Sequence, residues 1–101
     1  MKLVVLSNPR EGREDEFNKW YDEVHLPDLL AIPGVTAGAR YRVHHLEGMP
    51  SPAYRYLAIY ELDGEPEAVL AEMGARRADG RNVASDSVDA EHASLTAWEP
   101  L

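Results

Sequence analysis

The sequence predicts an α+β protein with a ferredoxin-like βαββαβ order, in which one four-stranded antiparallel sheet carries two helices on one face. Four short segments are rich in β-branched, aromatic or alternating apolar residues. Two further segments repeat apolar residues at helical spacing, and Gly, Pro or Asn turn signals separate the segments. The expected strands occupy residues 2–7, 35–45, 53–62 and 92–99, and the expected helices occupy residues 13–26 and a segment that begins at Pro66.

The first strand and the first helix follow from composition and turn residues. Residues 2–7 are rich in Val and Leu and are closed by Asn8-Pro9. In residues 13–26 three acidic side chains fall in the first turn, where they complement the helix dipole. Because Pro27 has no N–H and restricts the preceding residue, we expect this helix to end or kink near Leu26. Its buried stripe is expected to contain Phe17, Trp20, Tyr21, Val24 and His25.

Residues 35–45 alternate in polarity, which is typical of a half-buried strand. Residues 46–52 contain Gly48, Pro50 and Pro52 and indicate a hairpin connection or a longer flap. We expect one face of the second strand to carry Val35, Ala37, Ala39, Tyr41 and Val43.

The third strand, residues 53–62, has large side chains on both faces, since tyrosines alternate with Leu57 and Ile59. A sheet covered by helices on one side only would expose one of these rows to water. We therefore expect the uncovered face to pair with a second copy of the chain in a homodimer.

The remaining elements are a helix, a polar segment and a last strand. Pro66 suits the first turn of the second helix, and Val69, Leu70 and Met73 are expected on its inner face. Residues 79–90 are polar and are expected to form an exposed loop or a lid of undetermined role.

Length and charge limit the classes of function. A chain of 101 residues indicates a single domain, residues 1–101. The formal net charge of −8 argues against partners that require a basic surface, which are nucleic acids and anionic membranes. The N-terminal apolar run is too short for a signal peptide, so we expect a cytoplasmic protein.

Cofactor and metal signals are missing from the sequence. There is no cysteine, and the four histidines lack the spacings of metal-binding motifs. We therefore expect neither a cofactor nor a metal.

His25 is the leading candidate for proton transfer. At the end of a helix, and with Asp22 and Asp28 nearby in sequence, its charged form would be favoured, whereas burial would oppose it. The imidazole would then titrate near neutral pH and suit general acid or base catalysis. The alternative is a structural role, in which His25 is a packed helix terminator and Trp20 and Tyr21 are core residues.

The segment from Trp20 to Gly34 carries the pattern W-Y-D-x-x-H-x-P-D-x-L-x-x-P-G. Together with its flanking residues, about a third of the chain, it resembles the EthD-like branch of the dimeric α/β-barrel superfamily. The second half is similar mainly in the strand YLAIYEL, residues 56–62, and in Trp98. The resemblance implies a ferredoxin-like fold, dimerisation through the sheets, and a ligand cavity between the sheet and the helices of each subunit.

Small residues of the second strand, Ala37, Gly38 and Ala39, are expected to leave room for that cavity beside His25. The expected catalytic residues are His25 as acid or base and Asp22 or Asp28 as its orienting carboxylate. Arg40 or a tyrosine hydroxyl would stabilise an enolate, unless Arg40 and Arg42 are solvated or interface charges. The expected substrate-binding residues are Trp20, Tyr21, Arg40, Tyr41, Tyr54 and Tyr56.

Three functions are consistent with these residues. The first is a cofactor-independent enzyme that acts on a hydrophobic or aromatic carbonyl compound, as a dehydratase, cyclase, isomerase or monooxygenase. The second is a non-catalytic dimer that binds a metabolite or assists a pathway enzyme. The third is a haem-dependent oxidative enzyme with His25 as the iron ligand.

Overall fold

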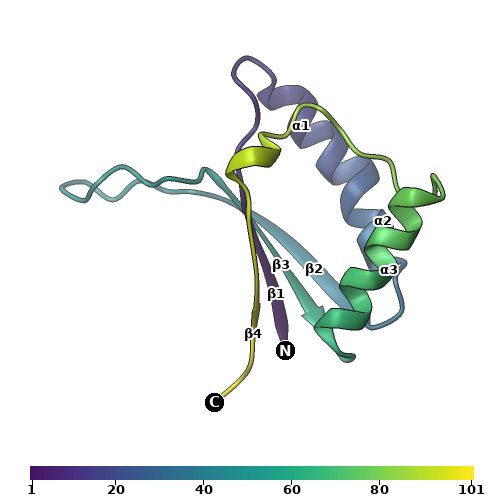
Figure 1. Ribbon diagram of the computed structural model, residues 1–101. Helices are drawn as coiled ribbons and strands as arrows, with labels where there is room; N and C mark the ends of the chain where they lie inside the picture. Colours follow the sequence, from purple (N-terminus) through teal and green to yellow (C-terminus); the bar gives the residue numbers. More distant parts are fainter.

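The computed structural model describes residues 1–101 and has the predicted order of elements. The strands are β1 (Lys2–Ser7), β2 (Val35–Arg42), β3 (Tyr56–Leu62) and β4 (Ser94–Trp98). They form one antiparallel sheet in the order β2-β3-β1-β4. The helices α1, α2 and α3 all lie on one side of this sheet (Figure 1). The ferredoxin-like α+β fold expected from the sequence is confirmed.

The first helix is longer than predicted, because it does not end at Leu26. It runs through α1 (Glu14–Trp20), a π-helical turn η1 (Tyr21–His25) and α2 (Leu26–Leu30). In the π-helical turn the Leu26 N–H donates to the carbonyl of Tyr21, five residues back. This wider turn directly precedes Pro27, which has no N–H to donate, and the helix continues past the proline. His25 therefore lies within the helix.

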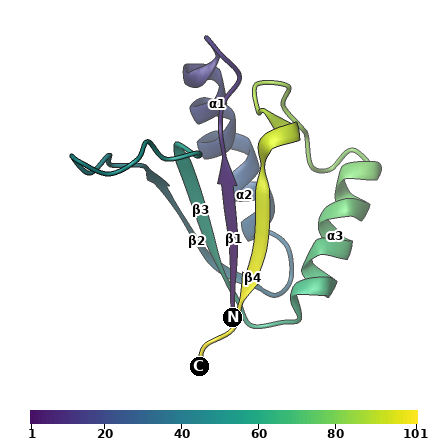
Figure 2. The same cartoon turned by 60° about the vertical axis from the view of Figure 1, so that its left-hand side comes forward.

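The second helix, α3 (Pro66–Ala78), lies beyond the β4 edge of the sheet (Figure 2). Its inner face buries Pro66 and Val69, whereas Leu70, expected on that face, is 37% exposed. Residues 79–89 follow without regular structure, and a short 3-10 turn η2 (Ala90–His92) leads into β4. The last strand is therefore shorter than the predicted residues 92–99.

A β-bulge between Val35 and Ala37 changes the faces of β2. Val35 is buried toward the helices, while Ala37, Ala39 and Tyr41 pair with the open-face residues of β3. The prediction that Val35 shares a face with these residues is wrong, because one extra residue in a strand reverses the alternation that follows it.

The strands β2 and β3 are also shorter than predicted at their connected ends. Residues 43–55 form an arm that projects from the side of the sheet opposite the helices (Figure 1). At its base the Val43 N–H donates to Arg55 O (2.8 Å), and Asn8 Nδ2 donates to Ala53 O (3.0 Å). All residues from 43 to 53 are exposed.

The core lies between the sheet and the helices, where β3 contributes alternate residues from Tyr56 to Leu62. The intervening residues Leu57 and Ile59 face the open side and are half-buried, as their alternation in the sequence predicts. No helix is long and apolar enough to span a bilayer. The buried apolar residues are Leu3, Phe17, Tyr21, Leu29, Ile32, Val35, Tyr56, Ala58, Tyr60, Leu62 and Val69.

Candidate functional site

A cavity of about 240 Å³ lies between the first helix, α3 and the strands β1 and β4. Most of its wall is apolar, and its polar groups are few: two serines, Tyr21, His25 and Arg77. Mostly apolar walls with a few polar groups are typical of small-molecule sites. The main apolar side chains of the wall are Val5, Trp20, Leu29, Met73, Val88 and Leu95.

The π-helical turn brings His25 to this wall beside two aromatic rings. Its imidazole stacks on Trp20 with a centroid distance of 4.5 Å and an interplanar angle of 19°. It also meets the Tyr21 ring edge-on at 4.8 Å. Neither ring nitrogen has a hydrogen bond from the protein, so both are free for a ligand. Trp20, Tyr21 and His25 are the predicted site residues that the structure brings together.

Burial, and to a smaller extent the positive charges of Arg77 and then Arg40, together lower the pKa of His25 to about 4. The imidazole is therefore neutral at pH 7. The expectation that its charged form is favoured is wrong for two reasons: the helix does not end at His25, and no carboxylate pairs with it.

The two predicted orienting carboxylates lie elsewhere. Asp22 accepts a hydrogen bond from Arg40 Nη1 at 2.6 Å and is an ion-pair partner of that guanidinium. Asp28 has no ion pair or side-chain hydrogen bond. Neither carboxylate is hydrogen-bonded to the imidazole, so the predicted pairing is absent from the structure.

Arg40 holds the first helix to the sheet. Its guanidinium lies 4.4 Å from the centre of the Tyr21 ring, and its Nη2 donates to Asn18 Oδ1 at 2.7 Å. The side chain is only 12% exposed, since Phe17 and Tyr56 also lie against it. It is not part of the cavity wall, so its predicted contact with a ligand is not supported by this arrangement.

The three predicted tyrosines of the second and third strands are also outside the cavity. Tyr56 is a core residue whose hydroxyl donates to Glu14 Oε1 (2.5 Å) and accepts from Asn18 Nδ2 (3.0 Å). Tyr41 is 53% exposed on the open face of the sheet. It shares a separate hollow of about 170 Å³ with Tyr54 at the base of the arm.

The space expected beside Gly38 is filled. A Cβ atom at this position would lie 2.9 Å from Leu26 Cδ1 and 3.0 Å from Tyr60 Cδ1. The small residues of β2 therefore permit close packing of the helix on the sheet and do not create a cavity. The cavity lies on the other side of His25, toward β4.

Two buried phenols lie next to each other in this region. Burial raises the pKa of both Tyr21 and Tyr60, and the neighbouring Tyr21 raises that of Tyr60 further. The Tyr60 hydroxyl is buried without a hydrogen-bond partner, whereas Tyr21 borders the cavity. Both phenols are neutral at pH 7, so Tyr21 is a potential hydrogen-bond donor to a ligand.

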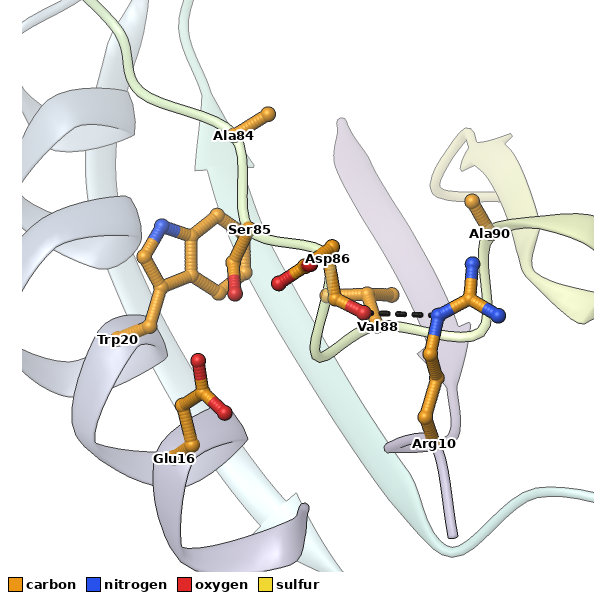
Figure 3. Close-up of a pocket in the computed structure, with 8 residues that line it drawn as sticks. All are labelled: Arg10, Glu16, Trp20, Ala84, Ser85, Asp86, Val88 and Ala90. Atoms are coloured by element: carbon orange, nitrogen blue, oxygen red, sulfur yellow. Dashed lines mark hydrogen bonds between the residues drawn. The ribbon is translucent and has the colours of Figure 1, made fainter.

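The polar segment 79–90 forms the outer wall of the site. A surface depression of about 670 Å³ on its far side shares Trp20, Ala84, Ser85, Val88 and Ala90 with the inner cavity (Figure 3). These shared residues lie between the cavity and the depression.

This outer wall is held in place by hydrogen bonds to Val83 and Asp86 in its middle. Trp20 Nε1 donates to Val83 O at 3.0 Å, and Arg10 Nε donates to Asp86 O at 2.7 Å. Arg13 pairs with the carboxylate of Asp86 at 2.8 Å, which lowers the pKa of that acid. The exposed loop or lid expected from the sequence thus lies over the site with defined contacts.

Sequence reasoning did not identify Arg77, Leu95 of β4 or Met73 as site residues, although it placed Met73 on the inner face of the second helix. Met73 and Arg77 follow the buried Val69 at intervals of four residues, so they lie on the inner face of α3. That spacing is visible in the sequence and was a usable signal. No group of three or more His, Asp or Glu side chains is arranged to hold a metal ion.

The one-sided packing of helices on an antiparallel sheet, with a cavity between the layers, defines a ferredoxin-like α+β protein. The chain is similar to the crystal structure of an ethyl tert-butyl ether d (EthD) family protein from Bacillus halodurans C-125, with a TM-score of 0.66 and 19% identity over 99% of this chain and 97% of that chain. It is also similar to HapK from Hahella chejuensis, with a TM-score of 0.56 and 16% identity over 98% of this chain and 93% of that chain.

Both similarities support the EthD-like resemblance, and at these identities they show the fold alone. Searches with the sequence found no matching family model and no matching curated protein.

Proposed function

We propose that this protein is a small cofactor-independent enzyme that performs acid/base chemistry on a hydrophobic or aromatic carbonyl compound. The observation that carries the proposal is His25, whose neutral imidazole borders an otherwise mostly apolar cavity without a hydrogen bond from the protein. A packed structural histidine would normally have a partner for its ring N–H. An imidazole with both nitrogens free is available to a substrate.

The chemistry begins with a proton on the carbon next to the substrate carbonyl. An imidazole nitrogen of His25 takes that proton, the C–H electron pair forms the new C–C double bond, and the π electron pair of the carbonyl moves onto its oxygen, giving an enolate. The Tyr21 hydroxyl borders the cavity and supplies a hydrogen-bond donor for that oxygen. Return of the proton to a different atom completes an isomerisation. In a dehydration the imidazolium gives its proton to a hydroxyl group on the next carbon, which leaves as water as the carbonyl re-forms.

The low pKa of His25 is compatible with this role. It is lowered by desolvation, by Arg77 and by Arg40, so it describes the cavity without a ligand. Negative charge that develops on a substrate oxygen offsets the two guanidinium charges and makes the imidazole more basic as the proton moves. Because the free enzyme holds His25 neutral above its pKa of about 4, we expect kcat/KM to fall only below that pH.

The test is proton exchange, which requires no knowledge of the natural substrate. Benzo-fused cyclic ketones such as 2-indanone and 2-tetralone are incubated with the protein in D2O, and loss of the signal of the hydrogens next to the carbonyl is followed by NMR. The wild type should accelerate this exchange and the variant His25→Gln should not. His44→Gln is the matched control, because His44 is exposed on the arm. Equal exchange by wild type and His25→Gln would refute the assigned role.

The second candidate is a non-catalytic dimer that binds a small metabolite. Two observations favour it: no carboxylate orients the imidazole, and the imidazole stacks on the Trp20 ring. The same experiment separates the two functions. Ketones that shift the Trp20 and His25 resonances without any accelerated exchange would favour binding alone.

We also propose that two copies of the chain associate through the open face of the sheet. Tyr41 and Trp98 on this face are 53% and 59% exposed, and the arm adds Leu46 and Met49 at 61% and 59%. Such an exposed apolar surface is typical of an interface. Light scattering should give twice the mass of the 11.3 kDa chain, and Ile59→Glu should reduce it to the monomer mass. A monomeric wild type at micromolar concentration would contradict the association.

A further inference from the structure

The charge on the cavity wall has the opposite sign to the charge of the protein. The chain has 18 acidic and 10 basic residues, yet no Asp or Glu side chain borders the cavity. Arg77 is the only formally charged residue of the wall at pH 7, since His25 is neutral. An acidic protein thus presents a single positive charge to whatever enters this cavity.

Arg77 also differs from most of the other arginines. Arg13, Arg40, Arg76 and Arg81 each form an ion pair within 3 Å. Arg77 has no ion pair and no side-chain hydrogen bond to the protein. An unpaired guanidinium at the wall of a mostly apolar cavity retains its five donors for a ligand.

Arg77 lies at the end of the inner face of α3. Val69, Met73 and Arg77 follow each other at intervals of four residues and so share the inner face of the helix. Val69 is buried and Met73 is half-buried, while Arg77 is exposed and stands at the rim of the cavity in the last turn. A positive charge in the last turn complements the helix dipole, and at this position it also borders the cavity.

We infer that the cavity selects a small molecule with an anionic group, such as an aromatic or alkyl carboxylate, whose charged end binds Arg77 at the rim. Its apolar body lies inside against Trp20, Leu29 and Met73, within reach of His25. A guanidinium binds a carboxylate through two parallel hydrogen bonds, which fixes the orientation of the bound molecule. This inference rests on the proposed function, because it names the substrate class of the same cavity.

The experiment compares acids with amides of the same shape. Binding of benzoate and 2-naphthoate, and of benzamide and 2-naphthamide, is measured by isothermal titration calorimetry, and the Trp20 indole N–H resonance locates the ligand. We expect the acids to bind about tenfold more tightly than the amides, as for a hydrogen bond to a charged group. Arg77→Gln should remove this preference and leave amide binding unchanged.

Two controls separate charge from folding. Arg42 is another exposed arginine without an ion pair, and it borders the separate hollow at the base of the arm. Arg42→Gln therefore removes the same charge from a different site and should leave the preference for acids intact. Arg77→Lys keeps the charge and should retain part of the preference. A preference that survives Arg77→Gln, or an equal loss of acid and amide binding in that variant, would overturn the inference.

The remaining outcomes distinguish this inference from the proposed function. If amides bind the wild type as tightly as acids, the preference for an anionic ligand is refuted, but the cavity beside His25 is still a ligand site. If neither class binds at millimolar concentration, the inference fails, and the ketone exchange experiment alone decides the proposed function.

Discussion

The space between the sheet and the helices is filled on the β2 side and hollow on the β4 side. On the β2 side, Leu26 and Tyr60 close the gap at Gly38, and Arg40 is enclosed by aromatic rings and paired with Asp22. On the β4 side a cavity of about 240 Å³ remains, and Arg77 at its rim is unpaired. One half therefore stabilises the fold, and the other retains the unpaired polar groups that a ligand requires.

The largest expected effect is in the filled half. Phe17 is fully buried, and its ring packs at 5.5 Å from Tyr21 and 5.1 Å from Tyr56, measured between centroids. Phe17→Ala should lower the free energy of unfolding by about 3–5 kcal/mol, as removal of a large core aromatic does. Urea denaturation measures this, and Met73→Ala in the hollow half is the comparison. Equal losses from both variants would show that the two halves do not differ in packing.

The filled half is also the part of the molecule that local sequence patterns predict. Alternation along β3 and the apolar stripe of the first helix identify the buried faces, because each follows from the geometry of one element. The β-bulge at Val35 and the π-helical turn before Pro27 were missed. Both depend on how neighbouring elements meet, and Pro27 alone indicates a helix end.

The site could be predicted only in part. His25, Trp20 and Tyr21 lie close together in sequence, so one helix places them in one wall. Arg77 reaches the same cavity from a helix more than 50 positions away, and no local pattern connects the two segments. Tyr41, Tyr54 and Tyr56, which were predicted to bind a ligand, lie outside the cavity. The face and the end of each strand, and not its composition, decide what borders the cavity.

The next largest effect is the dependence of stability on pH through His25. Its pKa is about 4 in the folded protein and 6.5 in the unfolded chain, so the unfolded chain binds more protons between these values. The free energy of unfolding is therefore unaffected by protonation of His25 above pH 6.5, and it decreases as the pH falls toward 4, because only the unfolded chain gains a proton at His25 in this range. Between pH 7 and pH 4.5 the wild type should lose about 2 kcal/mol more than His25→Gln. Parallel losses in both proteins would show that His25 is not desolvated.

A pair of arginine variants sharpens the comparison. Arg40→Gln breaks a partly buried ion pair and should lower the free energy of unfolding by about 1–2 kcal/mol. Arg77→Gln removes no contact with the protein and should change it by less than about 0.5 kcal/mol. The rise of the His25 pKa should be larger in Arg77→Gln than in Arg40→Gln, since Arg77 lowers this pKa more than Arg40 does. NMR titration of His25 measures the second quantity, and a larger rise of its pKa in Arg40→Gln would contradict the assigned geometry.

The smallest effects come from two glycines. Gly38→Ala places a methyl group 2.9 Å from Leu26 Cδ1 and 3.0 Å from Tyr60 Cδ1, and should cost about 1 kcal/mol through overpacking. Leu26 can turn its methyl group aside, but the Tyr60 ring is fully buried and cannot. Gly74→Ala on α3 meets no atom within 4 Å and should stabilise the helix by about 0.5–1 kcal/mol. Thermal denaturation should therefore show a loss of stability for Gly38→Ala and a gain for Gly74→Ala. If Gly38→Ala did not change the stability, the β2 side would contain free space that the structure does not have.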